Sequence, residues 1–228
     1  IQYSSIINYD EHIIRLARKI LKRYQEFDYH DYYFQHTDAV LELLAKMNQK
    51  QARPILNSFI DLQNNEINAV IIVAMIKNNL TVSAELMDNF CKIPTLRIQL
   101  YDELVKIGKQ SSFRGTYANQ RSFAEAFAML YTNNEIPEST PKSFDIVTIK
   151  DTLVNNINSR YYVFKVTCRY KYDTKSYPCI IGPFSTEDSN FSIKEGKEVF
   201  ILYRSKFDDK NIDTLFVDFI SKVSEMNK

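Results

Sequence analysis

The spacing of apolar residues divides the chain into two parts. Up to about position 133, apolar side chains recur every three or four residues, which is the spacing of one face of an α-helix. The predicted helices begin near Asp10, Thr37, Pro54, Ile67, Ser83 or Thr81, Pro94 and Ser122. The fourth of these, residues 67–77, is apolar on all sides, so we expect other helices to cover it on several sides.

Short helices joined by short breaks are typical of stacked helical pairs, because no single pair can bury its apolar face alone. We therefore predict a HEAT-like helical repeat domain over residues 1–133, with a compact irregular bundle as the alternative. The segment 134–143, which contains Pro137 and Pro141, is predicted to be a linker.

Beyond this segment the period of the apolar residues falls to two, which is typical of a β-strand. Tyr162, Phe164, Val166, Cys168 and Tyr170 mark the buried face of one such strand. Further strands are predicted at residues 146–153 and 198–203, and helical spacing returns at residues 212–223. The predicted fold is therefore α+β, with a small antiparallel sheet over residues 144–228 and a C-terminal helix that covers one of its faces.

The predicted turn at Asp173 and Thr174 would set the pairing of the two strands around it. It would place Cys168 opposite Cys179, with apolar side chains facing each other along the pair, whereas a one-residue slip would turn one apolar set to water. The two sulfurs would then be within bridging reach. We hypothesise a disulfide between Cys168 and Cys179. The alternative is two reduced cysteines in the core. A disulfide would favour an oxidising, extracytoplasmic compartment such as the periplasm or the cell surface.

The charges are almost balanced, with 29 Lys and Arg against 28 Asp and Glu and a net charge of +1. No overall field would steer such a chain to nucleic acid or to an anionic membrane. Arg97, Lys106, Lys109 and Arg114 are locally basic but lack interleaved exposed aromatics, so we expect no nucleic-acid partner. No apolar run approaches the roughly 20 residues of a membrane span. The chain begins at Ile1 rather than at methionine, which suggests a processed product or an excised fragment.

Residues with catalytic or metal-binding chemistry are few. The three histidines are His12, His30 and His36. His30 and His36 could bind zinc together with nearby aspartates, which are Asp28, Asp31 and Asp38, but their spacing matches neither a helical zinc-binding histidine pair nor a zinc finger. No nucleophile motif is present, and four glycines are too few for the usual phosphate-binding loops. We expect no catalytic residue, no metal and no cofactor.

An aromatic cluster follows the first predicted helix. Tyr24, Tyr29, Tyr32 and Tyr33, with His36, have no clean helical or strand period, and an exposed cluster of this kind would suit a protein-binding patch. The alternative is that the rings pack between helices.

Two groups of residues carry a resemblance to known proteins. Residues 68–82 (NAVIIVAMIKNNLTV) and 97–104 (RIQLYDEL) resemble a HEAT-type repeat. Together with residues 117–120 (YANQ) and 161–165 (YYVFK), they resemble the C-terminal tail of large bacterial envelope proteins that carry a TraB/GumN-like domain upstream. The resemblance spans about residues 54–184 and implies a non-catalytic appendage of a larger exported protein. The metal and catalytic motifs of the upstream domain are not in this chain, so no active-site residue is carried over.

The function predicted from the sequence is a non-catalytic protein-interaction or scaffolding module, forming the C-terminal part of a larger exported bacterial protein. One alternative is a small inhibitory or immunity-type protein that binds an enzyme or toxin through the aromatic patch. The second alternative is an unrecognised hydrolase, which would need a deep pocket with a perturbed acid or histidine.

Overall fold

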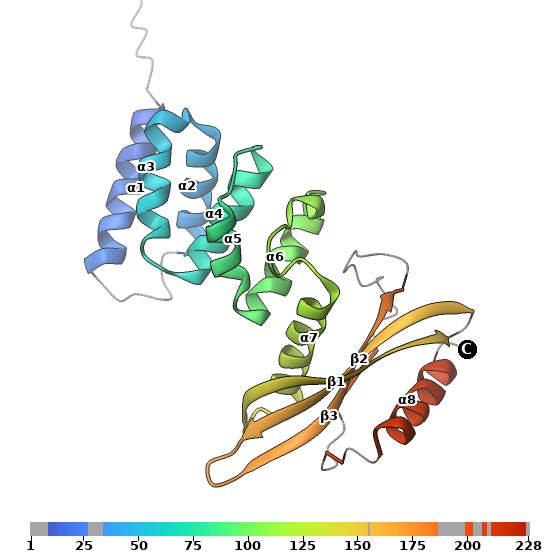
Figure 1. The fold of residues 1–228 in the computed structure, drawn as a ribbon. Coiled ribbons are helices and arrows are strands. Elements are labelled where there is room, and N and C mark those ends of the chain that lie inside the picture. The colour runs from blue at the N-terminus through green and yellow to red at the C-terminus, as the bar shows by residue number, and fades with distance from the viewer. Residues whose placement is uncertain are drawn as a thin grey trace, which may run out of the picture. The chain divides into compact units, whose positions relative to one another are not determined.

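A computed structural model describes residues 9–26, 34–154, 156–186, 199–202, 207–208 and 211–226. The chain forms two compact units, the first made of Ile1–Phe90 and Leu100–Arg114 and the second of Cys91–Gln99 and Gly115–Lys228. Helices come first, then an antiparallel sheet and a final helix (Figure 1), which confirms the predicted α+β class.

The helices and strands follow the order that the apolar spacing predicts. The helical elements before the sheet are α1 (Tyr9–Glu26), α2 (Phe34–Lys46), α3 (Gln49–Ile60), α4 (Asn65–Lys77), α5 (Ala84–Cys91), α6 (Pro94–Lys106), the 3-10 turn η1 (Gln110–Ser112) and α7 (Gln120–Glu135). The sheet contains β1 (Thr140–Val154), β2 (Ile157–Arg169), β3 (Thr174–Ser185) and β4 (Val199–Leu202), and α8 (Ile212–Met226) follows it.

The first unit is organised around α4, whose buried residues lie on more than one side of the helix. Ile71 and Ile72 are both fully buried although they are adjacent in sequence, as expected for a helix that is apolar all round. Ile67, Ile71 and Met75 of α4 share one core with apolar residues of α1, α2 and α3. Asn64 caps α4 by accepting hydrogen bonds from the backbone N–H groups of Glu66 and Ile67.

Several predicted helix starts were wrong, and two of these helices begin earlier because an asparagine caps them. Asn48 caps α3, so Pro54 lies within the helix, and Asn119 caps α7, so Ser122 lies within its first turn. Asparagine accepts hydrogen bonds from free helix N–H groups at least as well as serine does. Thr37 likewise lies inside α2.

The sheet of the second unit has helices on both faces. Its strands are antiparallel in the order β1-β2-β3-β4. Tyr161 and Val163 of β2 pack with Phe216 and Phe219 of α8. Because side chains alternate along a strand, Tyr162 points to the other face, where α7 packs against the sheet (Figure 1). We call the two sides of the sheet the α8 face and the α7 face, and the predicted covering of one face by the C-terminal helix is confirmed.

The boundary between the two units differs from the predicted one. The helix α7 belongs with the sheet rather than with the helices before it. It continues to Glu135 and β1 begins at Thr140, so most of the predicted linker 134–143 is helix or strand. Helical spacing shows that a segment has an apolar face but not which surface that face covers, and the sequence therefore assigned α7 to the wrong unit.

The predicted register of β2 and β3 was also wrong. Arg169 pairs with Thr174, Cys168 pairs with Lys175, and Cys179 lies opposite Phe164. The pairing differs by four residues from the predicted one, because the turn contains four residues and is closed by the Tyr170 N–H, which donates to the Asp173 carbonyl over 2.8 Å. Cys168 and Cys179 are buried with free thiols, so the hypothesised disulfide and the argument for an oxidising compartment lose their geometric basis.

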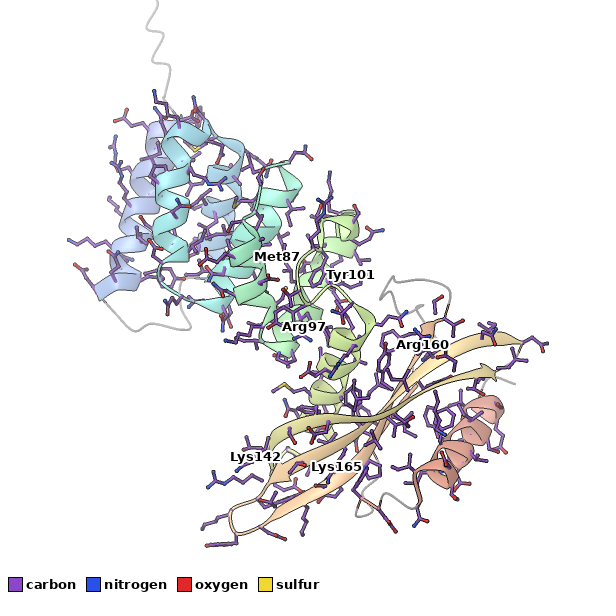
Figure 2. All side chains as sticks on the ribbon, in the orientation of Figure 1. Met87, Arg97, Tyr101, Lys142, Arg160 and Lys165 are labelled. Atoms are coloured by element: carbon purple, nitrogen blue, oxygen red, sulfur yellow. The ribbon has the colours of Figure 1, made fainter. Side chains whose placement is uncertain are left out.

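A buried arginine links three segments of the second unit. The guanidinium of Arg97 donates from Nε to the carbonyl of Cys91 over 2.9 Å and from Nη1 to the carbonyl of Ser122. The guanidinium of Arg97, which is labelled in Figure 2, also lies 4.6 Å from the ring centroid of Tyr117 and 3.9 Å from a carboxylate oxygen of Glu125. Burial lowers the pKa of Arg97, and the nearby carboxylate of Glu125 opposes that shift.

Candidate protein-interaction surface

The strand β1 forms one edge of the sheet. It pairs with β2 on one side, and no strand among the described residues pairs with its other side. Two residues of β1, Lys142 and Val147, have no partner in β2 and interrupt the register there. The stretch 148–154 is regular, and each of its residues has a partner in β2. A strand edge of this kind offers a row of unpaired backbone N–H and C=O groups.

Exposed apolar side chains lie along this regular stretch. Ile149 is 49% exposed and Leu153 is 60% exposed. Ile149 pairs with Tyr162 of β2, so it lies on the α7 face, and the alternation of side chains places Leu153 on the same face. We call residues 148–154 the free edge of the sheet.

An ion pair separates the two apolar side chains. Arg160 of β2, which is labelled in Figure 2, donates from Nε and Nη2 to the two carboxylate oxygens of Asp151 over 2.8 and 2.7 Å. These hydrogen bonds hold the pKa of Asp151 below its usual range and raise the pKa of Arg160. The bidentate geometry fixes both side chains at the surface, so the free edge presents an apolar, a charged and a second apolar position in turn.

A buried hydrogen-bond network supports this surface from within the second unit. The hydroxyl of Tyr162 donates to Oε1 of Gln120 over 3.4 Å, and Nε2 of Gln120 donates to the carbonyl of Ser185 over 2.8 Å. The rings of Tyr162 and Phe184 meet edge to face at 5.4 Å. Burial raises the pKa of Tyr162, so its hydroxyl stays protonated and able to donate at neutral pH. The network ties the start of α7 to both β2 and β3.

The opposite face of β1 is held by α8. Lys150, between Ile149 and Asp151, forms an ion pair with Asp213 at the start of α8. Its ammonium group lies 5.3 Å from the ring centroid of Phe216. The two faces of the free edge therefore differ, because the α8 face is engaged by a helix while Ile149 and Leu153 remain exposed on the α7 face.

The aromatic patch predicted from sequence is only partly within the described residues. Tyr29, Tyr32 and Tyr33 lie outside them. Tyr24 is half-buried against the first core, with its hydroxyl 3.3 Å from that of Thr37, so its ring packs between helices. His36 is exposed.

The candidate metal ligands between residues 28 and 38 also lie largely outside the described residues, which include only His36 and Asp38 of this group. Within the part of the chain that the structure describes, no group of three or more His, Cys, Asp or Glu residues is placed to hold a metal ion. Burial, with Glu42 and Glu66 nearby, raises the pKa of Asp38. None of the described helices is both long and apolar enough to cross a membrane.

The sequence predicts a strand at residues 146–153 but not its place at the edge of the sheet. Ile149 and Leu153 of this strand are exposed on the α7 face. A weak signal was available in the charged neighbours Lys150 and Asp151, because edge strands carry more charge than central ones.

Comparison of the chain with protein-family models, with curated proteins and with solved structures gave no match.

Proposed function

We propose that the chain is a non-catalytic protein-interaction module whose sheet binds an extended segment of a partner protein along the free edge of β1. The observation that carries this proposal is the regular stretch 148–154, whose outer side pairs with no strand in the described part of the chain and on which Ile149 and Leu153 are exposed on one face. Addition of a strand to a sheet edge is a common mode of peptide recognition, in which backbone hydrogen bonds give affinity and alternate side chains give specificity.

The side chains of the free edge define the chemistry of the partner segment. Side chains of the added strand that lie on the α7 face would meet Ile149 and Leu153, with the Asp151 and Arg160 pair between them. Apolar side chains opposite the two apolar positions, with a polar one between, would bury surface without leaving the ion pair unsolvated. The partner segment is therefore expected to be an alternating β-strand.

The rest of β1 confines binding to this stretch. Pro141 has no N–H to donate, and the unpaired residues Lys142 and Val147 break the register. Irregularities and charges of this kind protect sheet edges from non-specific pairing. A partner strand would therefore extend over residues 148–154 and not along the whole of β1.

Selection of peptides from a random library on the full chain tests the proposal. Selected peptides should slow amide hydrogen exchange within residues 148–154, and Ile149→Lys with Leu153→Lys should weaken their binding at least about tenfold, because lysine places charge against apolar side chains. The matched control is Val217→Lys on α8, which alters a 66% exposed apolar residue elsewhere on the same unit and should leave binding unchanged.

Two results would refute the proposal. One is a selection that yields only peptides whose affinity is unchanged by the Ile149→Lys and Leu153→Lys double substitution. The other is protection from exchange that falls outside β1.

The wider context stays a prediction. A HEAT-like repeat, a larger exported protein and a toxin-binding role through the aromatic patch are consistent with an interaction module, but the proposal does not depend on them. It depends only on residues of the second unit.

A further inference from the structure

The turn between β2 and β3 combines basic and aromatic side chains. Residues 169–175, which we call the hairpin tip, read Arg-Tyr-Lys-Tyr-Asp-Thr-Lys. Arg169, Lys171 and Lys175 are exposed. Tyr172 is 87% exposed, although tyrosine usually buries most of its ring. The tip therefore has basic side chains interleaved with an exposed aromatic ring.

The cations of the hairpin tip lie close to its aromatic rings. The ammonium group of Lys171 is 4.9 Å from the ring centroid of Tyr172, and that of Lys175 is 5.2 Å from the ring centroid of Tyr170. Asp173 is the one acidic residue of the tip, and its carboxylate is 4.0 Å from the ammonium group of Lys175. The tip therefore keeps a net positive charge next to an exposed π-surface.

The hairpin tip is held in shape by its own hydrogen bonds. The Tyr170 N–H donates to the Asp173 carbonyl over 2.8 Å, and the Thr174 N–H donates to the Asp173 carboxylate over 2.7 Å. The hydroxyls of Tyr170 and Tyr177 are 2.7 Å apart. A tip with this many internal bonds is ordered before it binds, which lowers the entropic cost of binding.

Further cations lie along the sheet behind the tip. Lys142 of β1 and Lys165 of β2 are nearer to the tip than Arg160 is (Figure 2). Lys142 is exposed, and the ammonium group of Lys165 lies 5.2 Å from the ring centroid of Phe207. These two lysines extend positive charge from the tip along the sheet.

We propose that the hairpin tip binds single-stranded nucleic acid, with a base stacked on Tyr172 and phosphates held by Lys171 and Lys175. Non-specific single-strand binding combines basic side chains that follow the backbone with aromatic rings on which bases stack. This site is separate from the free edge of β1 and does not depend on the function proposed for that edge. It reverses the expectation from sequence, which rested on the balanced overall charge and on a basic group, Arg97, Lys106, Lys109 and Arg114, that lacks interleaved exposed aromatics.

Two other anionic partners fit the hairpin tip less well. An anionic membrane would favour apolar side chains that enter the lipid, whereas the tip has Asp173 in its turn and no aliphatic residue. An acidic peptide would use the cations but gives no role to the exposed ring of Tyr172. Single-stranded nucleic acid uses both features.

Fluorescence anisotropy of a short labelled oligothymidylate, titrated with the full chain, tests the proposal. Tyr172→Ala should weaken binding at least about fivefold through loss of one stacked base. Lys171→Ala with Lys175→Ala should lower the slope of log affinity against log salt by about 1.4, since each phosphate contact contributes about 0.7 for single strands.

Matched controls use the same residue types at other exposed positions. Tyr9→Ala removes a tyrosine that is 71% exposed on α1, and Lys50→Ala removes an exposed lysine of α3. Both variants should bind the oligonucleotide as the parent chain does. Circular dichroism of Tyr172→Ala should match that of the parent, because the side chain makes few contacts.

Three outcomes would overturn the proposal. The first is that the parent chain shows no saturable binding of the oligonucleotide, and the second is that Tyr172→Ala binds as tightly as the parent. The third is that vesicles containing phosphatidylserine, or inorganic polyphosphate of equal charge, bind the tip more tightly than the oligonucleotide does.

Discussion

Replacement of Arg97 tests whether the second unit depends on a buried charge or on the geometry of the guanidinium. Arg97 is 1% exposed and donates to the backbone carbonyls of Cys91 and Ser122. Each hydrogen bond from a charged donor contributes about 1.5–3 kcal/mol, and removing the guanidinium recovers part of its desolvation cost. For Arg97→Met we therefore expect a loss of about 2–3 kcal/mol in the free energy of unfolding.

Arg97→Lys separates the two explanations. Lysine keeps the charge, but an ammonium group is more strongly hydrated and lacks the planar fork that reaches two carbonyls. We expect this variant to be destabilised at least as much as Arg97→Met. The ion pair with Glu125 adds little, because that side chain is 43% exposed and its carboxylate oxygen is 3.9 Å away.

Urea denaturation at fixed pH gives the required free energies. The chain has no tryptophan, so far-ultraviolet circular dichroism and the near-ultraviolet signal of buried tyrosines such as Tyr161 report unfolding. Arg18→Met on the exposed side of α1 is the control and should change stability by less than about 0.5 kcal/mol. The reasoning fails if Arg97→Met is within about 1 kcal/mol of the parent chain, or if Arg97→Lys restores full stability.

Three further predictions concern the sheet. Gly182→Ala should destabilise the chain by about 1–3 kcal/mol, because the alanine Cβ would lie 2.5 Å from the ring of Tyr161 and 2.8 Å from the carbonyl of Arg160. Urea denaturation would measure the loss of stability, and an unchanged denaturation midpoint would contradict the prediction. Asp151→Asn should cost up to about 1 kcal/mol at neutral pH. Arg160 lowers the pKa of Asp151 in the folded chain, so the ion pair stabilises the fold above the unfolded pKa and this stabilisation is lost as pH falls through the folded pKa. The difference in free energy of unfolding between Asp151→Asn and the parent should therefore shrink in acid. A difference that stays constant with pH would count against the ion pair. The thiol of Cys179 is fully buried and burial raises its pKa, so a thiol reagent should label it only after denaturation, and rapid labelling of the folded chain would show the burial to be wrong.

The sequence predicted the elements of the sheet better than their pairing, and the reason is the period of a strand. Cys168 was predicted to pair with Cys179 but pairs with Lys175, which is a register shift of four residues. A shift of four leaves every side chain on the face predicted for it. Alternation of apolar residues therefore excludes slips of one residue but not slips of two or four. The number of residues in the turn decides between these, and the sequence around Asp173 allowed either length.

The candidate site was missed for a related reason. Apolar spacing predicted a strand around Ile149 and a helix around Phe123, and both exist. Whether a strand lies at the edge of a sheet, and which surface a helix covers, depends on contacts between distant segments, which local spacing does not encode. The hairpin tip was overlooked because Tyr170 was assigned to the buried face of the strand and the turn was predicted at Asp173 and Thr174, whereas residues 170–173 form it.

The position of α8 has a consequence for the order in which the second unit becomes stable during synthesis. Tyr161, Val163 and Ile180 are made well before Phe216 and Phe219, which cover them. Until residues 212–226 have left the ribosome, that apolar layer lacks its cover and is open to chaperones or to aggregation. A nascent chain released before α8 should therefore be captured by chaperones or proteases instead of accumulating in a folded state.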